Sequence, residues 1–275
     1  MIAENDPENM WINLAGFEVL VLAETGSTND DAKIFSEQVD GEFAVWAKFQ
    51  NAGRGRENRH WQAAQGCSLT FSLVLRPGEN EIAFINQFTA LGALALADLL
   101  SSTYGLPAEI KWPNDVLIHG KKVSGILTEI IWSGSSLESI ILGIGVNFKS
   151  EAFIQAGELR FPATSLEAEG VEIDSLQDFL EQLLTSLRQR RQQLGSAQFL
   201  EDWNQKLAFR NQFMPINQYQ GKTEMLCPGS INADGSLNAR DQAGNWRVVY
   251  SSEFSDPSAG SSSLSTSSSE ESSSS

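Results

Sequence analysis

The sequence predicts an α+β protein with a small all-β unit near its C-terminal end. Strand-like runs rich in β-branched and aromatic residues, such as Phe17–Leu22 and Ser68–Leu75, alternate with helix-like segments. Apolar residues between positions 84 and 99 recur at steps of three or four, which is typical of a long helix packed on a sheet. After residue 209, short alternating runs are broken by Pro and Gly, as in consecutive hairpins.

Local signals in the sequence mark where the expected strands and helices begin and end. The strand at 17–22 is followed by capping residues at 25–31 and a helix to about residue 38. Gly105 and Pro107 end the long helix near residue 104. The other expected elements are strands at 43–49 and 68–75, a short strand ending at Lys111, a hairpin of 116–118 and 123–131, a strand at 139–148, and helices at 175–194 and 197–208.

These elements suggest four regions. Residues 1–16 are expected to be a lead-in, 17–208 the main domain, and 209–255 the small β domain. Residues 256–275 are mostly Ser, with three acidic residues. A segment with so little to bury is expected to be disordered.

Composition narrows the class of protein. The chain has 275 residues and a formal net charge of −16, with a pI near 4.5. Nonspecific nucleic-acid binding depends on neutralising phosphates, so this charge argues against it. No apolar run is long enough to span a membrane, and the N-terminus does not resemble a signal peptide. Cys67 and Cys227 are too far apart for a metal or redox motif, so we expect a cytoplasmic protein with reduced thiols.

Residues 48–61 form a basic segment in this acidic chain. It holds four Lys or Arg residues and one acidic residue, Glu57, a net charge of +3. Arg54 and Arg56 alternate with Gly53 and Gly55, and glycine permits positive φ and close approach of a ligand. The segment is interpreted as an anion-binding loop. A solvated basic turn between two strands is the alternative.

Two further stretches carry polar residues at the ends of expected strands. Ser27, Thr28 and Asn29 lie at a strand-to-helix corner, where they either cap the helix or contact a ligand. Lys111 is followed by Trp112-Pro113 and a polar turn, whereas Lys122 has a simpler interpretation as a charged hairpin residue.

Taken together, these motifs resemble the biotin protein ligases. The matching motifs, in order, are Ser27-Thr28-Asn29, Gln50-x-Ala52-Gly53-Arg54-Gly55-Arg56-x-x-Arg59-x-Trp61, Lys111-Trp112-Pro113-Asn114-Asp115, Lys122-x-x-Gly125-Ile126-Leu127-x-Glu129 and Gly143-x-Gly145-Val146-Asn147. The resemblance covers residues 17–150 well. It implies a mixed or antiparallel sheet flanked by helices, the biotin/lipoyl ligase-like catalytic domain, with a small SH3-like domain behind it.

The resemblance also implies an activity. Such a ligase joins biotin to ATP, releases pyrophosphate, and passes the biotinyl group from biotinyl-5′-AMP to a lysine of a biotin carboxyl carrier protein. ATP and biotin are thus expected substrates and Mg²⁺ an expected companion of ATP, although no protein ligand to a metal can be named. No nucleic-acid or membrane partner is implied, and the oligomeric state (monomer or homodimer) stays open.

The resemblance assigns roles by position. Lys111, Arg54 and Arg56 would be catalytic, since positive charge must separate two reacting anions. Biotin would be bound by Ser27, Thr28, Asn29, Gln50, Gly53, Arg54, Gly55, Arg56, Lys111 and Gly125. The nucleotide would be bound by Arg56, Arg59, Trp61, Lys111, Asn114 and Asn147.

The sequence departs from the family in three respects. Glu57-Asn58 replaces a pair that usually ends in Gly, and Asn58 is expected to take the positive φ of that turn. No helix-turn-helix segment precedes Phe17, so a repressor role is not expected. The C-terminal β unit is degenerate beside the usual SH3-like domain.

Two other functions remain open at this point. A lipoate-protein ligase of the same fold also uses a lysine beside a polar pocket, although the arginine run favours biotin. A noncatalytic protein that binds biotin or biotinyl-AMP is the second alternative, because Glu57 lowers the positive charge of the loop.

Overall fold

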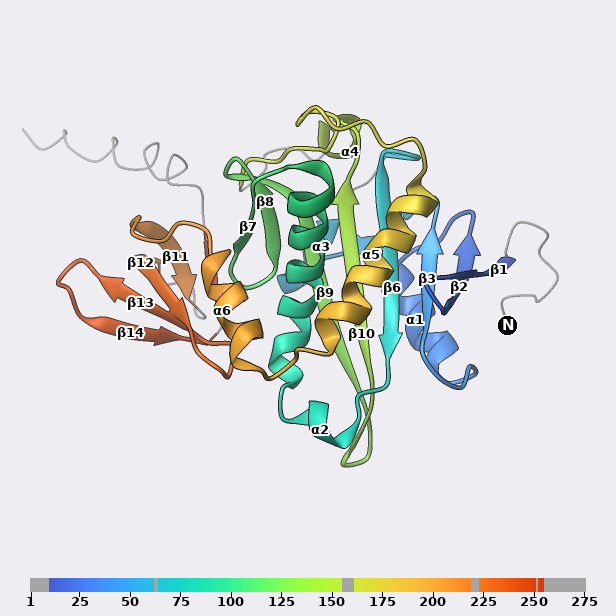
Figure 1. Ribbon diagram of the computed structural model, residues 1–275, viewed down its shortest axis with the longest axis horizontal. Coiled ribbons are helices and arrows are strands. Elements are labelled where there is room, and N and C mark those ends of the chain that lie inside the picture. Colours follow the sequence, from blue (N-terminus) through green and yellow to red (C-terminus); the bar gives the residue numbers. More distant parts are fainter. Residues whose placement is uncertain (1–9, 62–63, 155–160, 219–222, 251, 255–275) are drawn as a thin grey trace, which may run out of the picture.

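The computed structural model describes residues 10–61, 64–154, 161–218, 223–250 and 252–254. An eight-stranded sheet forms its centre (Figure 1). From edge to edge its strands are β1 (Met10–Leu14), β2 (Phe17–Leu22), β3 (Phe43–Ala47), β6 (Ser68–Leu75), β10 (Ser136–Asn147), β9 (Lys121–Ser133), β8 (Asp115–Ile118) and β7 (Ala108–Lys111). Only β2 and β3 are parallel, so the expected mixed sheet is confirmed.

Helices cover both faces of this sheet. The helices are α1 (Thr28–Ser36), α2 (Glu79–Ile82), α3 (Phe88–Tyr104), α4 (Glu151–Ile154), α5 (Leu176–Arg191) and α6 (Ala197–Gln205), with 3-10 turns η1 (Arg56–Asn58) and η2 (Ile85–Gln87). Figure 1 shows α3 and α5 side by side on one face. Val19 and Val21 belong to the larger apolar core, whereas Leu20 and Leu22 join a smaller core beside α1. Burial on both faces explains why β2 is apolar without interruption from Val19 to Leu22.

The start of the chain differs from the expectation. Residues 1–16 were expected to be a lead-in, but Met10–Leu14 form β1, which pairs with β2 along its length. Trp11 packs edge-on against Phe35 and Phe43, with ring centroids 6.3 and 6.0 Å apart. The short MWINL segment lacks strict alternation, so only the neighbouring strand identifies it as an edge strand.

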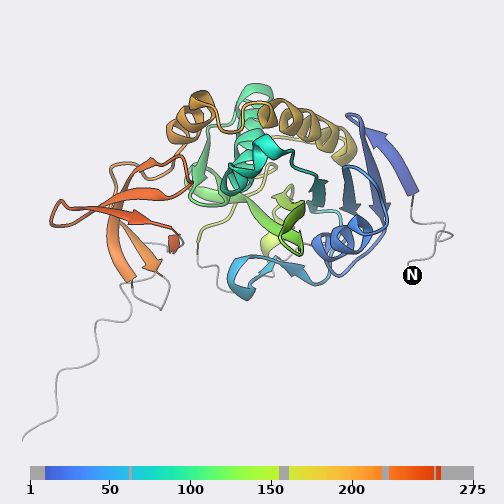
Figure 2. The same cartoon turned by 90° about the horizontal axis from the view of Figure 1, so that it is seen from below.

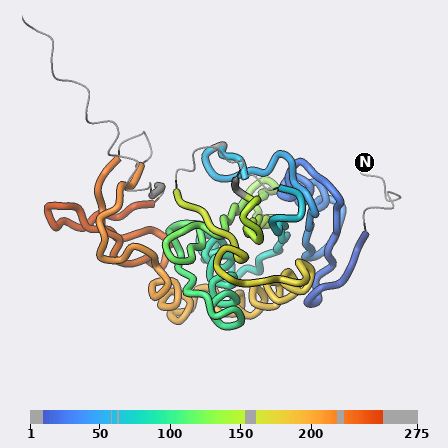
Figure 3. Tube along the Cα trace, turned by 90° about the horizontal axis from the view of Figure 1, so that it is seen from above, coloured from blue at the N-terminus to red at the C-terminus, as the bar shows by residue number. Residues whose placement is uncertain are grey.

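The C-terminal part forms a second, five-stranded antiparallel sheet. Its strands, in order, are β14 (Trp246–Val249), β13 (Leu237–Asp241), β12 (Thr223–Ile231), β11 (Met214–Gln218) and β15 (Ser252–Phe254). This sheet lies beside the larger one, next to α6 (Figure 2). Figure 3 shows β1 and the second sheet at opposite ends of the molecule. The expected small all-β unit is therefore confirmed, while the Ser-rich stretch of 256–275 lies outside the described residues.

The two cysteines and the helices of the described part of the chain bear on the expected class of protein. Cys67 and Cys227 are both unpaired and buried. No described helix has the length and apolar character needed to cross a membrane.

Candidate active site

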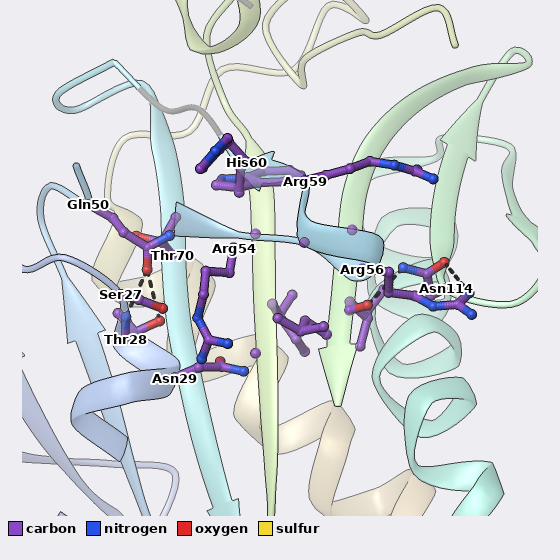
Figure 4. Close-up of a pocket in the computed structure, with 18 of the residues that line it drawn as sticks. Ser27, Thr28, Asn29, Gln50, Arg54, Arg56, Arg59, His60, Thr70 and Asn114 are labelled. Atoms are coloured by element: carbon purple, nitrogen blue, oxygen red, sulfur yellow. Dashed lines mark hydrogen bonds between the residues drawn. The ribbon is translucent and has the colours of Figure 1, made fainter. Parts of the chain in front are cut away.

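A cavity of about 120 Å³ lies between the sheet and the basic loop. The loop folds over the sheet as a short hairpin of β4 (Gly53–Arg54) and β5 (His60–Trp61). Side chains from the corner before α1, from this loop and from β6, β8, β9 and β10 line the cavity. Figure 4 shows polar side chains of the corner at one side and Arg56 with Asn114 at the other.

The polar side of the cavity is built by the corner before α1 and by Gln50. Ser27 is the N-cap of α1 but makes no side-chain capping bond, so capping does not explain this residue. Thr28 donates to Gln50 Oε1 from its backbone nitrogen (2.8 Å) and from Oγ1 (3.2 Å). All three side chains are buried. Buried donors and acceptors aimed at a cavity suit a ligand with matching polar groups.

Asn29 is held in one orientation beside this corner. Its Oδ1 accepts from Ser72 Oγ at 2.6 Å, and its Nδ2 donates to Glu129 Oε2 at 2.6 Å. A Cβ at Gly143 would lie 2.1 Å from Asn29 Oδ1, so only glycine at that position leaves room for the amide. The backbone of β10 thereby fits against the corner.

The indole ring of Trp61 forms one wall of the cavity at its middle. A Cβ at Gly145 would lie 2.4 Å from the indole, and one at Gly125 would lie 3.2 Å from it. The ring therefore occupies the space left by these two glycines of β9 and β10. Phe71 and Ile144 add further apolar surface to the cavity lining, so this stretch suits an apolar part of a ligand.

A pair of lysines shares one carboxylate at the cationic side. Asp115 lies 2.7 Å from Lys111 Nζ and 2.6 Å from Lys122 Nζ. Lys111 is only 3% exposed and Lys122 is 29% exposed. Burial alone would raise the pKa of Asp115, but the charges of the two lysines outweigh it and hold that pKa below its usual value. Burial lowers the pKa of Lys111, the more deeply enclosed of the two ammonium groups.

Arg56 adds a second cation to this side. Its Nη1 donates to Asn114 Oδ1 at 3.4 Å, and Asn114 Nδ2 donates to the Ile126 carbonyl at 2.9 Å. Burial lowers the pKa of Arg56 from its usual value, yet a guanidinium remains charged at neutral pH. Arg56 and Lys122 thus present positive charge to one cavity wall.

Arg54 has a different environment. Its guanidinium lies 2.6 Å from Asp30 and 2.9 Å from Glu129, and the side chain is 40% exposed. Figure 4 shows the side chain directed toward Asn29. Two carboxylates therefore compensate the charge of Arg54 in this state.

The turn inside the loop differs from the expectation. Glu57, not Asn58, has the positive φ of 55°. Glu57 also accepts from Arg59 Nη2 at 2.9 Å. Neither Gly53 nor Gly55 has positive φ, so the expected backbone freedom is not used here. Gly53 is needed for space instead, because a Cβ there would lie 2.3 Å from Gln50 Nε2.

Most of the residues expected at the site do line the cavity. These are Ser27, Thr28, Asn29, Gln50, Arg54, Gly55, Arg56, Arg59, Trp61, Asn114 and Gly125. Three do not line it. Gly53 lines a neighbouring pocket instead. Lys111 lies behind Asp115, with its Nζ 5.0 Å from the Phe161 ring centroid. Asn147 donates to the Thr164 carbonyl at 3.1 Å.

Sequence reasoning gave too little weight to Lys122 and Asp115, which both line the cavity. The signal for Lys122 was its position three residues before Gly125 within a family motif. Its place beside a hairpin turn favoured the simpler interpretation.

The chain is similar in sequence to several known ligases. The model of the biotin/lipoate A/B protein ligase family matches residues 21–147. A biotin–acetyl-CoA-carboxylase ligase of Paracoccus denitrificans is 37% identical over 227 residues, covering 82% of this chain and 91% of the relative. The bifunctional ligase/repressor BirA of Bacillus spizizenii is 41% identical over 131 residues, and this match spans 47% of the chain but only 40% of the relative's length.

A solved structure supports the same fold. The biotin protein ligase of Aquifex aeolicus, in complex with biotin and ATP, has a TM-score of 0.68 and 26% identity. The similarity covers 86% of this chain and 97% of that one.

Proposed function

This chain belongs to the biotin/lipoate A/B protein ligase family, and we propose that it joins biotin to a lysine of a biotin carboxyl carrier protein in two steps. Biotin and ATP first form biotinyl-5′-AMP and pyrophosphate. The acceptor lysine then takes the biotinyl group and AMP leaves. One observation carries this proposal: a single cavity has buried hydrogen-bonding groups on one side and the cations Arg56 and Lys122 on the other.

The polar side suits the ureido ring of biotin. That ring has two N–H donors and one carbonyl acceptor, so it needs both kinds of partner. Ser27 carries a hydroxyl group that can donate, and Asn29 Oδ1, which accepts from Ser72, keeps a second lone pair. Thr28 and Gln50 would join them by exchanging their mutual hydrogen bonds for bonds to the ring. The cavity wall formed by Trp61, Phe71 and Ile144 would receive the apolar ring and chain.

The cationic side suits the first chemical step. A biotin carboxylate oxygen attacks the α-phosphorus of ATP, a P–O bond forms, and the bond to the β-phosphate oxygen breaks. Both reactants are anions, so fixed positive charge is needed where they meet. The charge lowers the barrier because it stabilises the transition state more than the ground state. Arg56 offers a planar fork and Lys122 a compact charge at this position.

The position of Lys111 changes the role we propose for it. Lys111 lies behind Asp115 and outside the cavity lining, so it would act on the reaction through Asp115 rather than on biotin directly. We propose that Lys122 takes the place beside the mixed anhydride that the sequence assigned to Lys111. Asn147 and Arg59 remain candidates for contacts with the nucleotide.

The second step needs the acceptor amine to lose a proton. The amine attacks the biotinyl carbonyl carbon, an amide bond forms, and AMP takes the electron pair of the broken anhydride bond. Asp115 is a poor base for this proton because the two lysines hold its pKa low. We therefore assign no side chain as the base.

Magnesium would accompany ATP. Within the described residues, no group of three His, Cys, Asp or Glu side chains is arranged to hold a metal ion. Mg²⁺ commonly takes substrate phosphates and water as ligands. The ion would thus arrive as part of the nucleotide, and a cytoplasmic location would give the enzyme its ATP and its carrier protein.

Biotin-dependent exchange of labelled pyrophosphate into ATP tests this function. We expect exchange with biotin and none with lipoate, because a dithiolane ring cannot pair with the buried amide and hydroxyl groups of the polar side. Exchange with lipoate alone would move the protein to the other branch of the family. Biotin binding without exchange would identify a binding protein instead. Biotinylation of a purified carrier domain then tests the second step.

A further inference from the structure

Lys122 faces the cavity only because β9 contains a bulge. Side chains three positions apart on a regular strand point to opposite faces, so Lys122 and Gly125 would be separated. In the structure Ser124 pairs with Val116 while Lys122 pairs with Leu117, which leaves Val123 as an extra residue. A bulge of this kind turns the following side chains over. As a result, Lys122 Nζ would lie 3.1 Å from a Cβ built on Gly125.

The backbone of Lys122 is held by a segment outside the hairpin. Lys122 N donates to the Pro162 carbonyl at 2.7 Å, and Thr164 N donates to the Lys122 carbonyl at 2.9 Å. Residues 162–164 thereby run alongside β9 as a short parallel bridge centred on Ala163. Both backbone polar groups of Lys122 are paired by this segment, at the point where the bulge disrupts the regular ladder.

Thr164 fixes that segment. It is 2% exposed, and its carbonyl accepts from Asn147 Nδ2 at 3.1 Å. Its Oγ1 donates to Glu169 Oε1 at 2.6 Å. The other oxygen of Glu169 lies 2.7 Å from Nδ1 of His119, in the turn that joins β8 to β9. Glu169 therefore connects the segment to the tip of the same hairpin that carries Lys122.

We propose that Thr164 and Glu169 are positioning residues that aim Lys122 into the cavity. They hold residues 162–164 against the bulge, and the bulge turns the Lys122 side chain toward Asp115 and Trp61. Neither Thr164 nor Glu169 lines the cavity, so their effect on the reaction passes through Lys122. This inference rests on the proposed function, in which Lys122 stabilises the adenylation transition state.

Thr164→Val is the sharpest test, because it removes the hydroxyl and nearly preserves the shape. We expect a loss of about ten- to a hundredfold in kcat for biotin-dependent pyrophosphate exchange, since misplacing a catalytic group by about 1 Å has effects of this size. Thr164→Ser keeps the hydroxyl and should restore most of the rate. Thr185→Val is the matched control, because Thr185 Oγ1 donates only to the Glu181 carbonyl on the exposed side of α5.

A double-mutant cycle separates positioning from general structure. In a Lys122→Met background, Thr164→Val should cause no further loss of exchange, because the lysine through which it acts is gone. An equal loss in both backgrounds would overturn the proposal. If Thr164→Val does not fold, Glu169→Gln replaces it in the same cycle, with a smaller loss expected because the amide oxygen can still accept from Thr164.

A crystal structure of the Thr164→Val variant gives a readout independent of activity. We expect Lys122 Nζ to move away from Asp115, to which it is 2.6 Å distant in the native protein. An unchanged bulge and an unchanged Lys122–Asp115 contact would overturn the positioning role. Absence of exchange in the native protein would overturn the proposed function instead, and the crystal structure would still decide how Lys122 is aimed.

Discussion

Arg54, which lines the cavity, forms a two-point ion pair with Glu129 of β9. Nη1 lies 3.1 Å from Oε1, and Nη2 lies 2.9 Å from Oε2. The pair ties the basic loop to β9, and the same carboxylate also accepts from Asn29. Arg54 was expected to lie over the carboxylate and phosphate of the substrates. Arg54 does line the cavity, and from these contacts we propose that it also closes the loop while Glu129 orients Asn29.

Glu129→Gln should weaken biotin binding. The ion pair is partly exposed, so its loss is expected to cost no more than about 1 kcal/mol, a severalfold rise in the Kd of biotin. Stopped-flow measurement should assign this rise to faster dissociation, because the loop would open more often. Glu18→Gln is a suitable control, since Glu18 bonds only to Asn13 at the far edge of the sheet. An unchanged dissociation rate would contradict the closing role.

Lys122→Met should impair adenylation far more than Lys111→Met. Loss of a charge at the developing anhydride is expected to reduce kcat by roughly a hundred- to a thousandfold, by analogy with single oxyanion donors. Lys111→Met should mainly reduce stability, by about 2 kcal/mol, because it takes one of two partners from a buried carboxylate. Exchange kinetics and urea unfolding measure the two effects. The reverse order of kcat losses would restore the role that the sequence gave to Lys111.

Gln50→Leu should weaken biotin binding by about 1–3 kcal/mol of binding free energy. The variant leaves the buried hydroxyl and backbone N–H of Thr28 without their acceptor. The KM of ATP should change little, since Gln50 lies on the side of the cavity away from Arg56. Calorimetric titration with biotin and exchange kinetics with ATP test this pair of expectations. A large rise in the KM of ATP would argue against a cavity that binds biotin on its polar side and the nucleotide on its cationic side.

Gly145→Ala should displace Trp61 and abolish tight biotin binding. The added methyl would lie 2.4 Å from the indole, and a contact that short forces the ring to move. Gly78→Ala is the control, because its Cβ would meet no atom closer than 4.0 Å. Biotin titration of both variants is the measurement. Native affinity in Gly145→Ala would show that the wall formed by Trp61 is not part of the binding site.

Glu81 should contribute stability that depends on pH. Hydrogen bonds from Arg191, at 2.7 and 2.8 Å, hold the pKa of Glu81 below its usual value of 4.5. The folded state therefore takes up this proton less readily than the unfolded chain. The contribution is complete above about pH 5 and is lost as the pH falls through the lowered pKa.

Urea unfolding of Glu81→Gln at pH 7 and pH 3 tests this linkage. We expect the variant to lose about 1 kcal/mol of unfolding free energy at pH 7 and less at pH 3, because pH 3 lies below the usual pKa of 4.5 and the unfolded chain takes up the proton more readily than the folded state. Glu79→Gln, on the exposed side of the same short helix, should show no such difference. An equal loss at both pH values would exclude Glu81 as a source of acid sensitivity.

The local pattern of the chain determined most of the fold. Phe17–Leu22 and Ser68–Leu75 form the strands β2 and β6 with the expected bounds, and Gly105 ends α3 with a φ of 66°. These features depend on residues close in sequence, where periodicity and backbone freedom act directly. The family motifs likewise identified most of the cavity lining, since they carry the residue types that a polar and cationic pocket needs.

Only the tertiary structure decided which charges face the cavity. Arg54 is compensated by Glu129, 75 positions away, and no local pattern reveals such a partner. Lys122 reaches the cavity through a bulge that is supported by residues 162–164, although strand alternation alone gives the opposite face. Side-chain direction in a sheet reverses with a shift of one residue, and long-range pairing sets that shift. The sequence by itself therefore determined the elements and the kind of site, whereas the packing of distant segments determined which lysine lines the cavity and which arginine is paired with carboxylates.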